Sequence, residues 1–205
     1  MAAQTKRVGR KHILRQAEKL FTEHGYQGVS MRMLAEASGV TNAALYYHFE
    51  NKAALFREVM REHTKRVSAD IREAAEEEES YRAKVKAMTQ AYIRHASDQR
   101  SFLVLLRQRG KSNEFPKKKG AFIDMLLSIF KPFDEVIQQA SAAGAVVDFP
   151  TESSPAAILV GMFHGLAGYR RICHDSKVID EDIDFLVDLL WYGIANPEIS
   201  PTDES

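Results

Sequence analysis

The sequence predicts an all-α protein of about nine helices. Apolar residues recur at intervals of three and four along nearly the whole chain, which is the spacing of one helix face, and no clean two-residue alternation is present. Only 11 of the 205 residues are glycine and 6 are proline, so long helices with few turns are expected. Hydrophobic residues make up 45% of the chain, which is enough for a sizeable core.

The first helices have clear boundary signals. The first is expected over residues 8–24 and ends before Gly25, because glycine readily adopts the left-handed conformation that often follows a helix. A short second helix begins after Ser30, a favourable N-cap residue. A turn around Gly39 follows, and a third short helix comes directly after it.

A long fourth helix connects two predicted domains, 1–52 and 53–205. Asn51 can cap this helix, which ends near the acidic run 76–79. Pro132 should kink or restart the helix that contains it. Five later helices are expected near residues 81–96, 102–106, 117–142, 155–173 and 180–195.

Charge is distributed unevenly, although the whole chain is neutral. Residues 1–52 carry eight basic and four acidic side chains, so their net charge is +4 and that of the remainder is −4. A basic first quarter indicates a surface that faces nucleic acid. One cysteine excludes an intramolecular disulfide, and no stretch has the length of a membrane span or the apolar run of a signal peptide, so we expect a soluble, cytoplasmic protein.

Residues 30–52 read SMRMLAEASGVTNAALYYHFENK, which is a helix-turn-helix pattern. Leu34, Val40 and Leu45 can hold two short helices together, and Gly39 permits the tight turn between them. The outward positions of the second helix are small or able to form hydrogen bonds. This pattern suits a recognition helix that enters the major groove of DNA.

Two longer stretches carry a family resemblance, AEKLFTEHGYQGVSMRMLAEASGV and LYYHFENKAALF. They resemble the DNA-binding domain of the TetR family of transcriptional regulators, over roughly the first 60 residues. The rest of the chain is similar to that family only in length and helical character. The resemblance implies a homodimeric regulator, most simply a repressor, that binds an inverted-repeat operator in double-stranded DNA.

The resemblance implies nine DNA-contacting positions. Thr41, Asn42 and Ala43 occupy the base-contacting positions, because asparagine suits adenine and an alanine methyl suits the thymine methyl. Arg32 would reach a phosphate or a guanine edge, and Lys52 would add a charge near a helix N-terminus aimed at the DNA backbone. The full set is Ser30, Arg32, Thr41, Asn42, Ala43, Tyr46, Tyr47, His48 and Lys52.

Plainer interpretations of these residues are open. The aromatic run 46–48 could be a packed cluster, and Tyr47 could either pack inward or lie on the DNA backbone. Thr41 and Asn42 could serve as a helix cap alone, although a cap and a base contact fall at the same place. The basic residues 6–11 could be a solvated tail rather than extra phosphate contacts or a minor-groove arm.

The last two helices are expected to form the dimer interface, as the resemblance implies. One of them carries three glycines on one face, and each costs up to about 1 kcal/mol in a helix interior relative to alanine. Close approach of another helix would explain such a row; the alternative is that the row packs inside one subunit. The expected interface residues are Gly161, Gly165, Gly168, Leu186, Leu190 and Trp191.

The middle helices carry large, adaptable apolar side chains, which suit both a core and a pocket for an apolar ligand. We expect a small apolar or amphipathic effector to bind among them, to push on the far end of the fourth helix near Ile71 and to lower operator affinity. The candidate residues are Met88, Tyr92, His95, Phe102, Leu106, Phe122, Met125, Leu126, Met162 and Phe163. Further polar candidates are Gln99, Arg107, His164 and Tyr169.

Rival functions were weighed against this one. The chain has no nucleophile elbow, no phosphate-binding or dinucleotide-binding glycine loop and no H-E-x-x-H pair, so neither an enzyme nor a cofactor or metal site is expected. The alternative is a DNA-bound protein of the same fold that recruits a protein partner and has no small-molecule inducer. A thermal-shift screen would separate the two, because a ligand of the folded state raises its stability.

Overall fold

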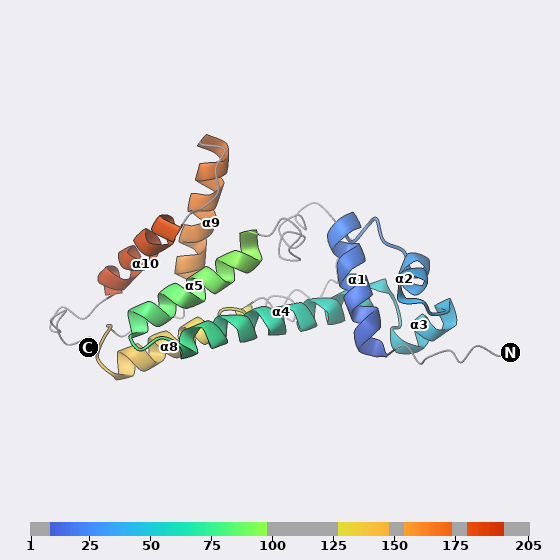
Figure 1. Ribbon diagram of the computed structural model, residues 1–205, viewed down its shortest axis with the longest axis horizontal. Helices are drawn as coiled ribbons and strands as arrows, with labels where there is room; N and C mark the ends of the chain where they lie inside the picture. The colour runs from blue at the N-terminus through green and yellow to red at the C-terminus, as the bar shows by residue number, and fades with distance from the viewer. Residues whose placement is uncertain (1–8, 98–126, 148–153, 174–179, 195–205) are drawn as a thin grey trace. The chain divides into compact units, whose positions relative to one another are not determined.

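The computed structural model describes residues 9–97, 127–147, 154–173 and 180–194. Every regular element within these ranges is an α-helix, which confirms the predicted all-α class (Figure 1). None of these helices is long and apolar enough to cross a membrane. The eight helices are α1 (Arg10–His24), α2 (Met31–Ser38), α3 (Asn42–His48), α4 (Lys52–Glu76), α5 (Tyr81–Ser97), α8 (Lys131–Ala142), α9 (Pro155–Cys173) and α10 (Asp180–Ile194).

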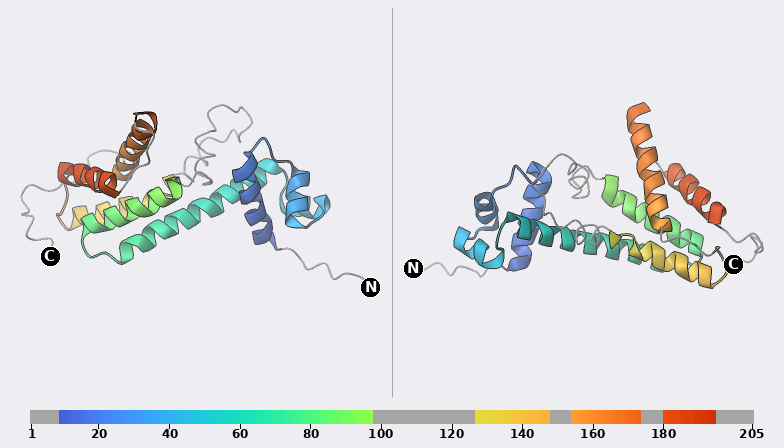
Figure 2. Two further views of the ribbon diagram at one scale, coloured as in Figure 1. Left: turned by 45° about the horizontal axis from the view of Figure 1, so that its top comes forward. Right: turned by 180° about the vertical axis from the view of Figure 1, so that it is seen from behind.

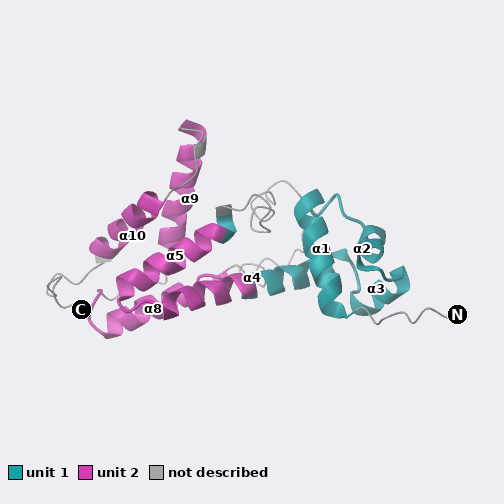
Figure 3. Cartoon of the chain, viewed as in Figure 1, with its two compact units in different colours: residues 1–65, 95–125 teal, residues 66–94, 126–205 magenta. Residues whose placement is uncertain are grey.

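The helices divide between two compact units (Figure 3). The first unit contains α1, α2, α3 and α4 as far as residue 65. The second contains α4 from residue 66, α5 as far as residue 94, and α8, α9 and α10. The predicted domain boundary at residue 52 lies earlier on the same helix and stays a prediction.

Capping interactions set the helix boundaries of the first unit. Gly25 after α1 and Gly39 after α2 adopt positive φ angles of 70° and 66°. The side-chain oxygens of Ser30, Thr41 and Asn51 each accept a hydrogen bond from a backbone N–H three residues on, at 3.2, 3.1 and 2.8 Å. These bonds satisfy donors that the start of a helix otherwise leaves free. The boundaries predicted from these five residues are confirmed.

An aromatic cluster holds α1 against α4. Phe21 meets Phe56 edge-on with 5.0 Å between ring centroids, and Tyr26 packs against both rings at 5.9 and 4.9 Å. Such pairs contribute about 0.5–1.5 kcal/mol beyond the burial of their area. The other buried apolar side chains described in the first unit are Ile13, Leu14, Ala17, Val29, Leu34, Ala35, Leu45, Phe49, Leu55, Val59 and Met60.

In the second unit, α9 packs against both α8 and α10, as two views show (Figures 1 and 2). Pro132 lies in the first turn of α8, so it begins this helix, in agreement with the predicted restart. Ser154 caps α9 by accepting from the Ala157 N–H at 3.2 Å, and Pro155 is its first helical residue. This start was also predicted.

Two ion pairs connect α10 to α5 within the second unit. Arg82 Nε donates to Asp188 at 2.8 Å, and Lys86 Nζ lies 2.6 Å from Asp184. The two pairs are one helical turn apart on both helices, which forms a ladder between α5 and α10. The hydrogen bond to Asp188 raises the pKa of the Arg82 guanidinium above its usual value.

Candidate nucleic-acid interface

The turn between α2 and α3 is built by backbone hydrogen bonds. The Gly39 N–H donates to the carbonyl of Glu36 at 3.1 Å, and the Val40 N–H donates to that of Ala35 at 3.0 Å. This is a Schellman motif, which needs a left-handed residue where Gly39 lies. Thr41 is the N-cap of α3. This helix therefore begins at Asn42, two residues after Val40 completes the C-terminal cap of α2.

One face of α3 is exposed. Thr41, Asn42 and Ala43 are exposed at its start, and Tyr46 and Tyr47 are 53% and 87% exposed one turn later. Residues separated by four lie on the same side of a helix, so these positions share one surface. The structure thus brings the predicted base-contacting residues together with Tyr46, predicted to contact a phosphate, and with Tyr47, for which packing inward or lying on the DNA backbone were both open.

The exposed fractions of the side chains also choose between the two interpretations of the aromatic residues 46–48, a packed cluster or a DNA-contacting surface. Tyr47 is 87% exposed, so inward packing of this side chain is wrong, and Tyr46 and Tyr47 do not form a packed cluster. His48 is half-buried, with its ring 5.3 Å from that of Tyr47 and 6.3 Å from that of Phe49. Of the three aromatic residues, His48 therefore offers DNA the smallest surface.

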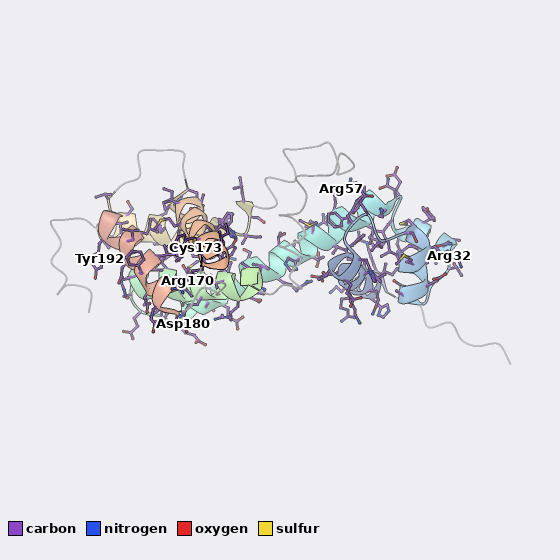
Figure 4. All side chains as sticks on the ribbon, turned by 90° about the horizontal axis from the view of Figure 1, so that it is seen from above. Arg32, Arg57, Arg170, Cys173, Asp180 and Tyr192 are labelled. Atoms are coloured by element: carbon purple, nitrogen blue, oxygen red, sulfur yellow. The ribbon has the colours of Figure 1, made fainter. Side chains whose placement is uncertain are left out.

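Two more predicted DNA contacts, Ser30 and Arg32, lie at the start of α2, the helix that precedes α3 in the sequence. The Ser30 hydroxyl accepts from the Met33 N–H and can still donate its own proton. Arg32, labelled in Figure 4, donates from Nε to Glu36 Oε1 at 2.8 Å while its side chain is 80% exposed. The hydrogen bond and charge of Glu36 raise the pKa of the Arg32 guanidinium. Such exposed pairs are weak, so Arg32 can exchange Glu36 for DNA.

Lys52 has partners that the sequence did not predict. Its Nζ donates to the backbone carbonyls of Tyr26 at 3.0 Å and Val29 at 2.9 Å. An ammonium group has three N–H donors, so one is left for a phosphate. The phosphate contact stays a prediction. The carbonyl contacts escaped the sequence analysis because they join residues 23 and 26 positions apart.

Arg10, expected in a basic N-terminal arm, also has contacts within the first unit. Its guanidinium donates to Glu58 of α4 at 3.1 Å and lies 4.9 Å from the ring centroid of Phe49. Arg10 therefore links α1 to α4 and to the end of α3. The remaining basic residues of the arm before residue 9 lie outside the described residues.

A helix-turn-helix whose second helix exposes small and hydrogen-bonding groups is typical of DNA-binding proteins. Residues 13–59 match the family model described as bacterial regulatory proteins, tetR family. Over these residues the resemblance to the TetR family that the sequence predicted is confirmed. Members of this family are DNA-binding regulators and not enzymes.

Individual relatives and structures agree with this assignment. The HTH-type transcriptional repressor AcnR of Corynebacterium efficiens is 39% identical over 64 residues, which are 31% of this chain and 34% of that protein. The chain thus spans about a third of the length of the curated relatives it matches. A solved structure of a protein of unknown function from Rhodococcus sp. RHA1 is similar with a TM-score of 0.75 and 27% identity, over 94% of this chain and 100% of that one. A structure from Mesorhizobium loti, assigned to the TetR family, shares the fold with a TM-score of 0.74 and 19% identity, over 93% and 100%.

A second candidate surface runs along α9 and α10 of the second unit. A Cβ placed on Gly161, Gly165 or Gly168 would meet no atom of the described residues within 4 Å, which argues against the alternative that the row packs inside one subunit. Large apolar side chains surround these glycines or continue from them on α10, where Figure 4 labels Tyr192. On α9 the spacing puts Ile158, Tyr169 and Ile172 on the side of the glycines, and on α10 it puts Phe185, Leu189 and Tyr192 on one side. We refer to these six residues and the three glycines together as the α9–α10 apolar face.

The residues predicted for this surface on α10 need correction. Leu186, Leu190 and Trp191 are only 5%, 6% and 2% exposed, so they belong to the core of the second unit. The predicted residues belong to the longest apolar stripe of the helix, which is the stripe that packs inward. A second stripe at spacings of four and three, Phe185, Leu189 and Tyr192, was the signal for the exposed face.

Seven effector candidates lie within the described residues, including the polar candidates His164, which is half-buried, and Tyr169, which is exposed. Met88, Tyr92 and Phe163 are buried in the second unit, and Met162 is half-buried there. His95 is half-buried at the end of α5 and falls in the first unit. The other candidates lie outside the described residues: Phe102, Leu106, Phe122, Met125 and Leu126, with the polar candidates Gln99 and Arg107.

A polar pair lies among the buried candidates. The Tyr92 hydroxyl is 2.9 Å from Nε2 of His164, so α5 and α9 share a hydrogen bond. The Tyr92 ring packs near those of Phe163 and Phe130, at 6.2 and 5.9 Å between centroids. A hydrogen-bonding pair with apolar surroundings is the arrangement that orients an amphipathic ligand, and it is also common in a plain core.

Proposed function

We propose that this protein is a homodimeric transcription regulator that binds an inverted-repeat operator. The observation that carries the proposal is the exposed face of α3, where Thr41, Asn42 and Ala43 lie beside Tyr46 and Tyr47 on the recognition helix of a TetR-family domain. Amide and methyl groups there can read base edges, while hydroxyl groups can donate to phosphates. A regulator of transcription acts where the chromosome is, so a cytoplasmic location is part of this proposal.

The homodimer is supported by the α9–α10 apolar face. Six large apolar side chains and a glycine row on two adjacent helices leave apolar surface exposed to water, and burying it against a second copy is favourable. Glycines let another helix approach closely. A two-fold dimer presents two recognition helices, which is why the operator should be a palindrome with half-sites one helical turn apart, about 34–36 Å.

Repression and its release by an effector complete the proposal. The repressor AcnR is similar over the DNA-binding domain only, so the mode of regulation rests on that likeness. A small apolar or amphipathic molecule would bind in the second unit, with Tyr92 and His164 as its polar partners. Through α4, which belongs to both units, it would change the placement of the recognition helices and weaken operator binding.

Selection of duplexes from a random library tests the DNA-binding proposal. The wild-type protein should enrich an inverted repeat, and affinity for it should fall steeply with salt because several groups contact phosphates. Asn42→Ala should lose the base preference at one position in each half-site and keep the others. If the Asn42→Ala variant keeps every base preference, Asn42 does not contact a base. If the wild-type protein enriches no inverted repeat, the proposal is wrong.

The effector is tested from two sides. A thermal-shift screen with small amphipathic compounds supplies a ligand, which is then titrated against the protein free and bound to operator DNA. The coupling expected for such a switch is about 1–3 kcal/mol, so the two affinities should differ roughly 5–150-fold. Equal affinities would show that the compound does not act as an inducer.

A further inference from the structure

Lys52 is held inside the DNA-binding unit by three contacts. Its Nζ donates to the carbonyl oxygens of Tyr26 and Val29 at 3.0 and 2.9 Å, and it lies 4.4 Å from the centroid of the Tyr26 ring. Hydrogen bonds from an ammonium group are stronger than those between neutral partners. A cation over an aromatic face is attracted as well. The charge of Lys52 therefore has favourable partners before any DNA is bound.

These partners lie in the segment that leads into α2. Tyr26 and Val29 belong to the connection between α1 and α2, and Ser30, the N-cap of α2, follows Val29 directly. The Tyr26 ring is itself packed against Phe56 of α4 at 4.9 Å. Lys52, at the start of α4, thus holds in place the connection that leads to Ser30, the first predicted DNA contact.

We propose that Lys52 is a positioning residue for DNA binding and not a phosphate ligand. It holds the connection before α2 in place and so sets where Ser30 and Arg32 meet the operator. Two carbonyl oxygens and the Tyr26 ring already hold the ammonium group against this connection, so a phosphate could accept only its third N–H. The inference rests on the proposed function and replaces the role that the sequence alone predicted for this lysine.

The salt dependence of operator binding distinguishes the two roles. Each phosphate neutralised by a cation adds about 0.9 to the slope of log affinity against log salt concentration. Lys52→Gln should weaken operator binding roughly tenfold at fixed salt, because two charge-assisted hydrogen bonds are lost, while the slope stays that of the wild type. Lys52→Arg, which keeps the charge and can donate to the same carbonyls, should recover most of the affinity.

Three further variants calibrate this measurement. Lys65→Gln is the matched control on α4, because Lys65 is 66% exposed and only 3.7 Å from Glu62, and it should leave affinity and slope unchanged. Arg32→Gln removes a predicted direct contact and should lower the slope by about 0.9 if that contact is to a phosphate. Tyr26→Leu removes the ring beneath the ammonium group and should weaken binding about threefold without changing the slope.

Thermal unfolding of each variant shows that it is folded at the assay temperature. A slope about 0.9 smaller for Lys52→Gln would overturn the inference in favour of a phosphate contact. Folded Lys52→Gln with wild-type affinity would also overturn it, because the lysine would then serve stability alone. If Lys52→Gln does not fold, Tyr26→Leu decides: wild-type affinity in that variant overturns the inference. A wild-type protein that prefers no inverted repeat refutes the proposed function itself, which is a different result from any of these.

Discussion

The two units of the chain differ in what they expose. Among the described residues of the first unit, the exposed large apolar side chains are Tyr46 and Tyr47, which carry hydroxyl groups and lie on the recognition helix, and the others are buried or half-buried. The second unit exposes aliphatic and phenyl groups, with Ile172 at 85% and Phe185 at 63%. A surface for DNA needs hydrogen-bonding groups, whereas a surface for a second protein copy needs apolar area. The difference agrees with the partner proposed for each unit, DNA for the first and a second copy of the chain for the second.

The largest expected effect tests which residues of α10 form the core. Trp191→Ala should lower the free energy of unfolding by about 3–5 kcal/mol, because the indole is 2% exposed and its removal leaves a cavity. Urea denaturation at one protein concentration measures this. Val147→Ala is the control, since Val147 is 42% exposed and should change stability by only about 0.5 kcal/mol. If Trp191→Ala lowers the free energy of unfolding by less than 1 kcal/mol, Trp191 is not part of the core.

The next effect concerns the α9–α10 apolar face. Leu189→Arg should raise the dimer dissociation constant about 30-fold or more, which corresponds to about 2 kcal/mol at a central interface position. Gly165→Leu should weaken the dimer too, because its side chain would separate closely packed helices. Light scattering over a concentration series measures both, with Val147→Arg as the matched control outside α9 and α10. A wild-type protein that is monomeric at micromolar concentration would contradict the proposal that the α9–α10 apolar face is a dimer interface.

A pair of helix caps separates stability from DNA binding. Thr41→Ala and Ser154→Ala each remove an N-cap, so each should lower stability by about 0.5–2 kcal/mol. Only Thr41→Ala should also weaken operator binding, because Thr41 lies on the DNA-facing unit. Calorimetry and a fluorescence titration with operator give the two quantities. Equal losses of operator affinity in both variants would mean that the caps act through stability alone.

The smallest effect is expected at the ladder between α5 and α10. Arg82 and Asp188 are 29% and 38% exposed, so a double-mutant cycle with Arg82→Gln and Asp188→Asn should give a coupling of about 1 kcal/mol or less. The coupling should decrease at high salt, because exposed charges are screened. A coupling above 2 kcal/mol that salt leaves unchanged would make this ladder a main support of α10.

Local features were predictable from the sequence and distant contacts were not. The caps at Ser30, Thr41 and Asn51 and the glycine after α2 depend on residues within four positions, so a single sequence reveals them. The partners of Lys52 depend on how α4 packs against the connection before α2. Sequence spacing carries no information about that packing.

The candidate sites divide in the same way. The exposed positions of α3 were predictable because a recognition helix puts small and polar groups outward in a recognisable order. The face of α10 was chosen wrongly because this helix is apolar on two sides, and only its packing against the rest of the second unit decides that Leu186 is buried and Phe185 exposed. An apolar stripe predicts that a helix face is buried, but it does not show whether that face packs against the same chain or against a partner.

The spacing of the operator half-sites tests the central claim most directly. The account predicts that two recognition helices of one dimer bind two half-sites on the same side of the duplex. Inserting five base pairs between the selected half-sites turns one of them to the opposite side, since a helical turn takes about 10–10.5 base pairs. A fluorescence titration should then show affinity reduced about 100-fold or more, toward that of unrelated DNA. Unchanged affinity for the lengthened duplex would contradict the account, because each α3 would then bind its half-site independently of a dimer.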